Sequence, residues 1–280
     1  MRKLIGTFLL TMWSLSVMAQ SGELTIKITD FVEGAIPIAV VPFEWQAATP
    51  APTDVAEVID SDLARSGEFK PLERLDFPGV PYNKSDVIFR DWQLLRIDHL
   101  VIGKLQNLGD GRYLVQYRLL DVLRGDESLN AQFTVPESNL RGVAHHIADE
   151  IYEHITGRRG AFNTRIAYVT ETQGADGEPR YSLNVADSDG HNRRNVLTST
   201  QPVLSPAWSP DGKHLAYVSY ERRQAQIVVQ ELATGTRRLM SAFPGLNGAP
   251  AWSPDGTQLA VTLSKDGNPE IYALNVATKR

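Results

Sequence analysis

The sequence predicts an α/β N-terminal domain followed by an all-β propeller, and two observations support this prediction. The hexapeptide Ala-Trp-Ser-Pro-Asp-Gly occurs at Ala207–Gly212 and again at Ala251–Gly256, 44 residues apart. A motif that returns at a period of about 40–50 residues is typical of propeller blades. Residues 20–157 lack the period and mix helix-like with strand-like stretches, as α/β domains do.

The first residues have the pattern of a secretory signal peptide over residues 1–19. Arg2 and Lys3 precede an apolar stretch that runs from Leu4 to Val17. This stretch is shorter than the about 20 residues of a membrane-spanning helix, so we expect cleavage after Ala19 and no direct membrane span. The chain has no cysteine, which excludes disulfides and thiolate chemistry and, in an exported protein, favours a bacterial periplasm.

Residues 20–157 are predicted to form the α/β domain. Leu24–Thr29 alternates apolar and polar residues like a half-buried strand, and the apolar run Ile36–Phe43 predicts a strand covered on both faces. Asp54 is placed as a helix N-cap, apolar residues follow at helical spacing, and Gly67 stands where that helix would end.

The second half of this domain is predicted to contain a helix, a hairpin, a third strand and a long helix. The first helix is expected near Asp86–Arg96, and Gly109-Asp110-Gly111 is a hairpin signal between two apolar stretches. A strand over Leu129–Val135 follows. The long helix is expected to be capped by Ser138 and to reach Thr156, before a linker over residues 158–160.

The hexapeptide has the chemistry of a β-turn that follows an inter-blade tryptophan. Its proline presets φ, its aspartate bonds to the local backbone, and its glycine supplies a positive φ. A reading of Ser209 with Asp211 as a nucleophile–acid pair is weaker, because residues copied in each unit serve the repeat. The predicted structural turn residues are Trp208, Pro210, Asp211, Gly212, Trp252, Pro254, Asp255 and Gly256.

The propeller segment is predicted to be partial. A degenerate first unit begins at Arg165–Thr170, and residues 161–280 hold about 2.7 units of 44 residues. Propellers close with about 4–8 blades. We therefore expect that the sequence is the N-terminal part of a longer protein.

We predict no catalytic, cofactor or metal site. His145, His146 and His154 fall on the long helix without a metal-binding spacing and are expected on an exposed polar face, and Asp187-x-Asp189-Gly190 is interpreted as a turn. The net charge is −5 and the basic pairs are scattered, so nucleic acid is not expected as a partner.

Five stretches, taken in order, carry a family likeness. They are Ile36–Trp45 (IPIAVVPFEW), Asp62–Phe69 (DLARSGEF), Gly160–Val169 (GAFNTRIAYV), Leu204–Val218 (LSPAWSPDGKHLAYV) and Asn247–Gly256 (NGAPAWSPDG). The Ser-Pro-Asp-Gly turn alone is common to many propellers. The ordered set, behind a signal peptide and an α/β domain, resembles the TolB family of the bacterial Tol–Pal system.

The resemblance implies a periplasmic protein with a six-bladed propeller, of which about 2.7 blades are present here. It implies a non-enzymatic adaptor that links the outer-membrane lipoprotein Pal with the inner-membrane protein TolA. Such an adaptor supports outer-membrane integrity and the invagination of that membrane during cell division. Other outer-membrane proteins are further candidate partners.

The resemblance also implies two binding sites, one in each domain. A TolA-binding segment is expected at the mature N-terminus, where a free alternating strand could add to a partner's sheet, and Pal is expected at the mouth of the propeller. The TolA set is Ser21, Gly22, Glu23, Leu24, Thr25, Ile26, Lys27, Ile28, Thr29, Asp30, Phe31, Val32 and Glu33, and the Pal set is Pro202, Val203, Leu204, Ser205, Leu246, Asn247, Gly248 and Ala249.

An alternative function remains open on the sequence. Ser-Pro-Asp-Gly blades would also fit a periplasmic peptidase whose propeller gates a hydrolase domain absent from this chain. The sequence that follows residue 280 would distinguish the two hypotheses, because further blades favour the adaptor and a Gly-x-Ser-x-Gly segment favours the peptidase.

Overall fold

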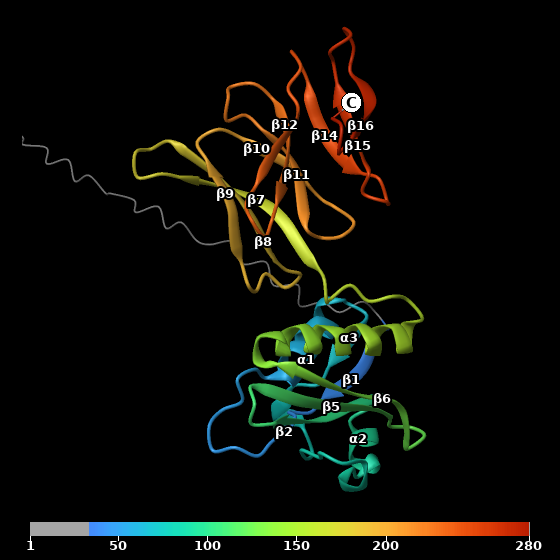
Figure 1. Cartoon of the computed structure of the whole chain (residues 1–280). Coiled ribbons are helices and arrows are strands. Elements are labelled where there is room, and N and C mark those ends of the chain that lie inside the picture. The colour runs from blue at the N-terminus through green and yellow to red at the C-terminus, as the bar shows by residue number, and fades with distance from the viewer. Residues whose placement is uncertain (1–33, 280) are drawn as a thin grey trace, which may run out of the picture.

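The structure, a computed structural model, describes residues 34–279 (Figure 1). The predicted signal peptide, the strand at Leu24–Thr29 and the TolA-binding segment Ser21–Glu33 lie outside the described residues. Within the part that is described, no helix combines the length and the apolar character needed to cross a membrane. An α/β body and a group of separate β-sheets follow one another along the chain, which is the predicted fold class.

A mixed sheet of six strands forms the centre of the N-terminal body. Its main path runs β3-β1-β4-β5-β6, with parallel pairs around β1 and antiparallel pairs from β4 to β6, and short β2 pairs with β4. The strands are β1 (Ile36–Val40), β2 (Glu44–Trp45), β3 (Phe69–Pro71), β4 (His99–Asn107), β5 (Arg112–Asp121) and β6 (Asp126–Pro136).

Strand β1 is buried on both sides, as its continuous apolar sequence predicts. Ile38 and Val40 belong to one apolar cluster, whereas Ala39 and Val41 belong to a second cluster on the other face of the sheet. Successive side chains of a strand point to opposite faces, so a strand between two clusters must be apolar at consecutive positions. The observed strand ends at Val40, before the end of the predicted run.

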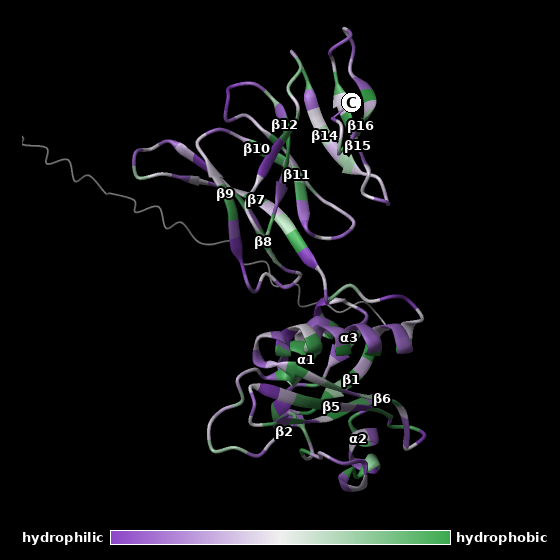
Figure 2. Ribbon diagram, viewed as in Figure 1, coloured by the Kyte–Doolittle hydropathy of each residue, from purple (hydrophilic) through white to green (hydrophobic). Residues whose placement is uncertain are grey.

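Helices cover both faces of the sheet. Helices α1 (Val55–Arg65) and α3 (Leu140–Thr156) pack together over the first cluster, and α2 (Phe89–Leu94) lies with the second. Short 3-10 turns occupy Arg74–Asp76, Lys84–Asp86 and Glu137–Asn139. Figure 2 shows hydrophilic colour over much of α3 and many loops, and both hydrophilic and hydrophobic colour along the strands.

The predicted N-terminal cap of α1 is present in the structure, whereas that of α3 is not. Asp54 caps α1 as predicted, because its carboxylate accepts the Glu57 N–H at 3.0 Å. The prediction that Ser138 caps α3 is wrong. Ser138 lies inside the 3-10 turn Glu137–Asn139, and the helix begins only at Leu140. Since this turn already curls the backbone, Ser138 cannot take the extended conformation of an N-cap.

Three antiparallel sheets form the propeller part, with three, four and three strands. Strands β10 and β14 begin at equivalent positions of the repeat, and each runs into one copy of the hexapeptide. The two strands lie next to one another. The sheets are β7 (Arg165–Gln173), β8 (Pro179–Asp187) and β9 (Arg194–Ser199); β10 (Val203–Trp208), β11 (His214–Ser219), β12 (Gln226–Glu231) and β13 (Arg237–Ser241); and β14 (Asn247–Trp252), β15 (Gln258–Leu263) and β16 (Glu270–Asn275).

Adjacent sheets pack face to face through apolar clusters. In β11, Leu215 and Tyr217 join the cluster shared with the first sheet, while Ala216 joins the cluster shared with the third. Trp208 and Trp252 each pack against one of these clusters. The two tryptophans therefore lie between neighbouring blades, as predicted.

The hexapeptide copies are turns in both units. Gly212 and Gly256 have φ values of 64° and 71°, which a residue with a side chain seldom adopts. The Ser209 hydroxyl donates to Asp211 Oδ1 at 2.5 Å and accepts the His214 N–H at 2.9 Å. Because the turn uses the hydroxyl for its own bonds, the geometry agrees with the structural interpretation of these residues.

The segment that joins the two bodies is fastened to α3. Gly157 ends the helix in the left-handed region with φ 71°, as predicted. The Asp149 carboxylate then accepts the N–H groups of Phe162 at 2.7 Å and Asn163 at 3.1 Å. A Cβ atom at Gly160 would lie 2.3 Å from Asp149 Oδ1, so only glycine allows this close return of the chain.

Candidate binding site at the propeller mouth

The loops before β10 and β14 lie at the end of the propeller that faces away from α3. Arg165 Nη2 donates to Gly212 O at 2.8 Å, and Arg165 is paired with Asp187, so these three residues share one end. That end contacts α3 through the ion pair between Arg141 and Asp189. Gly212 lies in the turn that joins the end of β10 to the start of β11. The start of β10, where Val203 pairs with Ser219, therefore lies at the opposite end of the propeller.

The eight residues predicted to bind Pal divide by exposure. Leu204 and Leu246 are 47% and 41% exposed, so two large apolar side chains of this set lie on the surface. Ser205 and Ala249 are also exposed, whereas Pro202 and Gly248 are partly exposed. Val203 and Asn247 are buried, so these two can only support the surface from beneath.

The backbone of the mouth takes the same unusual conformation in both copies. Ser205 has φ 51° and Ala249 has φ 47°, both in the left-handed region although neither is glycine. A register shift in the ladder accompanies each of them, between Leu204 and Ala207 and between Gly248 and Ala251. Bulges of this kind redirect side chains, and residues held in this region are often found at functional sites.

Asn247 fixes the loop that precedes β14. Its Oδ1 accepts the Ser241 hydroxyl at 2.6 Å and the Phe243 N–H at 3.1 Å. Its Nδ2 donates to Phe243 O at 2.6 Å. A buried side-chain amide that bonds both polar groups of one residue determines the path of the chain, and here it brings Leu246 to the surface.

Two residues of this surface were missed on the sequence. Phe243 is 41% exposed, and the Lys265 ammonium lies 5.7 Å from its ring centroid and 4.5 Å from that of Tyr272. A hydrogen bond to Asp266 raises the pKa of Lys265. Phe243 stands just before the predicted loop, and an apolar residue next to Pro244-Gly245 could have indicated an exposed position. No such signal exists for Lys265, because its position depends on the β15–β16 hairpin.

The histidines of α3 divide differently from the prediction. His146 and His154 are exposed, as expected of a polar face. For His145 the expectation is wrong, because it is 2% exposed and is covered where the β8–β9 turn meets α3. The predicted turn at Asp187–Gly190 is present, with Gly190 at φ 84°.

The fold and the mouth define a two-domain β-propeller protein with an N-terminal α/β domain. Two family models match consecutive parts of the chain: the TolB amino-terminal domain matches residues 24–128, and the TolB beta propeller domain matches residues 152–280. The chain belongs to the TolB family.

Individual relatives agree with this assignment. The chain is 50% identical over 247 residues to the Tol-Pal system protein TolB of Nitrosococcus oceani, covering 88% of this chain and 57% of the relative. It is 48% identical to the protein of the same name from Xanthomonas oryzae, covering 84% of this chain and 54% of the relative. The crystal structure of TolB from Acinetobacter baumannii matches with a TM-score of 0.80 and 38% identity, over 91% of this chain and 61% of that one. The chain thus spans about half the length of these curated relatives.

Proposed function

We propose that this protein is a non-enzymatic periplasmic adaptor of the Tol–Pal system, which holds Pal at the propeller mouth and TolA through the segment Ser21–Glu33. In this role it would support outer-membrane integrity and the inward movement of that membrane during cell division. The relatives carry the name "Tol-Pal system protein TolB", which supports membership of the system. The observation that carries the binding proposal is the exposed apolar mouth.

The chemistry of the mouth suits a protein partner. Leu204, Leu246 and Phe243 present exposed apolar side chains. Asn247 fixes the loop that carries Phe243 and Leu246, so little ordering of that loop is needed on binding. The Lys265 ammonium beside Phe243 is already paired with Asp266 at 2.8 Å. We therefore infer that the bound surface of Pal has an apolar centre.

The Pal site is tested by calorimetry on the full-length protein. Substitution L246D places a charge in the apolar centre and is expected to weaken Pal binding at least tenfold. Substitution L123D is the matched control, because Leu123 is 70% exposed on the N-terminal body, away from the mouth. Equal Pal affinity of wild type and L246D would contradict the site.

The TolA site is tested by deleting Ser21–Glu33 from the mature protein and repeating a TolA pull-down. The deletion is expected to abolish TolA capture and to leave the thermal unfolding of the propeller unchanged. Undiminished TolA capture would show that another surface binds TolA. Measuring Pal affinity on the same deletion also tests whether the two sites are coupled through the joint at Gly157–Gly160.

The adaptor role predicts that the protein catalyses no hydrolysis. In both hexapeptide copies the serine hydroxyl donates to its neighbouring aspartate, and in each it also accepts a backbone N–H. These hydroxyls are engaged in identical turns. Turnover of peptide substrates by the purified full-length protein would refute the proposal.

A further inference from the structure

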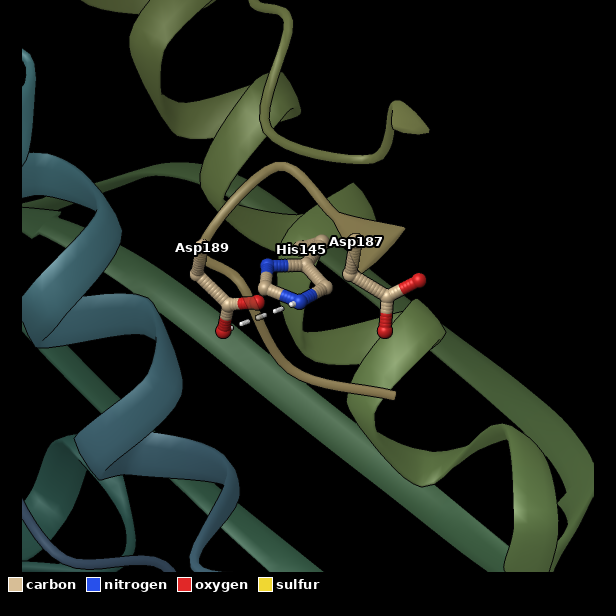
Figure 3. A group of neighbouring side chains, drawn as sticks. All are labelled: His145, Asp187 and Asp189. Carbon is tan, nitrogen blue, oxygen red and sulfur yellow. Dashed lines mark ion pairs between the residues drawn. The ribbon is translucent and has the colours of Figure 1, made fainter. Parts of the chain in front are cut away.

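Two features that are more than 40 residues apart in the sequence meet at the junction of the two bodies. His145 projects from α3, and Asp187 and Asp189 flank the β8–β9 turn of the propeller (Figure 3). One ligand atom from each of these three residues lies within 4.8 Å of the others. An imidazole and two carboxylates from different bodies therefore converge on one small volume.

His145 is held in the orientation of a metal ligand. Its Nδ1 lies 2.6 Å from Asp62 Oδ2, and both side chains are buried. The opposite ring nitrogen, Nε2, is buried, has no hydrogen-bond partner within residues 34–279, and lies 3.7 Å from Asp189 Oδ2. Metal-bound histidines characteristically give their other ring N–H to a carboxylate, which fixes the tautomer and turns the free lone pair toward the metal.

The charged groups around His145 have a net negative charge that a bound cation would balance. Carboxylates are contributed by Asp62, Asp187 and Asp189. Among the residues that the structure describes, the guanidinium groups that pair with them belong to Arg65, at Asp62, and to Arg141, at Asp189. With a neutral imidazole, this group of side chains carries one uncompensated negative charge. An unshared imidazole lone pair that faces a carboxylate is unfavourable unless a proton or a cation lies between them.

The carboxylates are positioned but not fully used. Asp187 accepts the Asn192 amide at 2.6 Å through Oδ2. Asp189 accepts the His191 N–H at 2.9 Å through Oδ1 and the Arg141 guanidinium through Oδ2, the oxygen that faces His145. Each carboxylate has further lone pairs available. Both precede Gly190 in the β8–β9 connection, so one short segment of chain carries both carboxylates. Zinc–oxygen distances of about 2.0–2.2 Å would require the three ligands to draw closer together than they are here.

We propose that His145, Asp187 and Asp189 form a binding site for a first-row divalent cation, with Zn²⁺ as the natural occupant of a one-histidine, two-carboxylate set. Zinc accepts imidazole nitrogen and carboxylate oxygen with tetrahedral geometry, and water would complete the fourth position. Mg²⁺ and Ca²⁺ prefer oxygen ligands alone and are expected to bind much more weakly. Because the ligands come from both bodies, the bound ion would fasten the propeller to α3.

The first test measures Zn²⁺ affinity of the tag-free mature protein by competition with a chromophoric chelator. Wild type is expected to bind one Zn²⁺. D187N and H145Q are each expected to lower the affinity at least tenfold, with far-UV circular dichroism confirming that each variant is folded. H146Q removes an exposed histidine of the same helix and is the matched control, with unchanged affinity expected.

Three outcomes would overturn the proposal. They are no measurable Zn²⁺ binding by wild type, equal affinity in wild type and D187N, or loss of binding in H191Q alone, which would place the ion on the exposed turn. A second readout gives the position directly. A zinc-soaked crystal should show an anomalous difference peak about 2.0–2.1 Å from His145 Nε2, and a peak elsewhere would refute the assignment.

Discussion

The two repeat segments that contain the hexapeptide, Leu204–Ser219 and Gly248–Leu263, form the same backbone and carry different surfaces. Both have the glycine turn, the inter-blade tryptophan, the bulge and the left-handed residue at matching positions. The side chains at the mouth differ, since Leu204 corresponds to Gly248. Residues that are repeated build the blade, and residues that vary between copies are the ones available for binding.

A second difference lies beneath the surface. Val203 and Asn247 occupy the same repeat position, and both are buried. Val203 belongs to the apolar cluster shared with the first sheet, whereas Asn247 bonds the loop at Phe243. One position therefore serves packing in one blade and loop geometry in the next.

The largest effect is expected from the tryptophans that the two copies share. Trp252→Ala should lower the free energy of unfolding by about 3 kcal/mol, because it removes an aromatic side chain between blades. Its Nε1 also donates to Ala207 O at 3.2 Å, whereas the Trp208 Nε1 has no partner among the described residues. Calorimetric unfolding should therefore show a smaller loss of unfolding free energy for Trp208→Ala than for Trp252→Ala. The reverse order would contradict this expected difference between the two tryptophans.

The next effect separates the two buried positions. Asn247→Val makes the third sheet resemble the second and is expected to cost about 2 kcal/mol, because the polar groups of Phe243 and the Ser241 hydroxyl lose their partner. Denaturant unfolding measures this loss. The reciprocal Val203→Asn is the control and should also destabilise, since it buries an amide without partners. Unchanged stability of Asn247→Val would show that the loop before β14 keeps its conformation without the Asn247 hydrogen bonds.

A smaller effect of opposite sign is expected at the left-handed residues. Ser205→Gly and Ala249→Gly each relieve backbone strain of about 1–2 kcal/mol and lose about 0.5–1 kcal/mol through the freer unfolded chain. The net expectation is a gain of about 0.5 kcal/mol at either site, measurable as a slightly raised melting temperature. Destabilisation at only one site would show that the copies are not equivalent there.

The smallest effect concerns acid. Hydrogen bonds from Ser209 and Ser253 hold the pKa values of Asp211 and Asp255 below the usual 3.8. Because the folded-state pKa is lowered, the stabilisation is complete above pH 3.8 and disappears as the pH falls through the folded-state value. Melting temperatures between pH 2 and pH 5 should show a weaker acid dependence for Asp211→Asn and Asp255→Asn. The same slope as wild type would exclude a contribution from these turns.

Local signals predicted much of the fold. The turn at Gly212, the Asp54 cap and the apolar run of β1 each specify structure through nearest neighbours, and each is present. Ser138 failed because a 3-10 turn before α3 competes with the predicted cap, and nothing in the local sequence distinguishes the two. The same kind of capping signal therefore placed the start of α1 correctly and the start of α3 wrongly.

The candidate sites depended on contacts between distant segments. His145 lies on a helix whose own pattern does not bury it, and it is covered by Asp62 of α1 and by the turn that begins at Asp187. Ser205 and Ala249 adopt positive φ although no glycine marks them, because the ladder to the next strand imposes a bulge. Such features follow from packing between sheets and helices, and single-segment patterns cannot encode them.

The Asp149 carboxylate has a mechanical consequence. By accepting the N–H groups of Phe162 and Asn163, it returns the chain to α3 immediately after the helix has ended. A force that pulls on the propeller is therefore transmitted to α3 through these two hydrogen bonds. The short segment Gly157–Gly160 cannot extend freely, because the chain is held to α3 directly after it. A partner that pulls on the propeller would load the mixed sheet through α3.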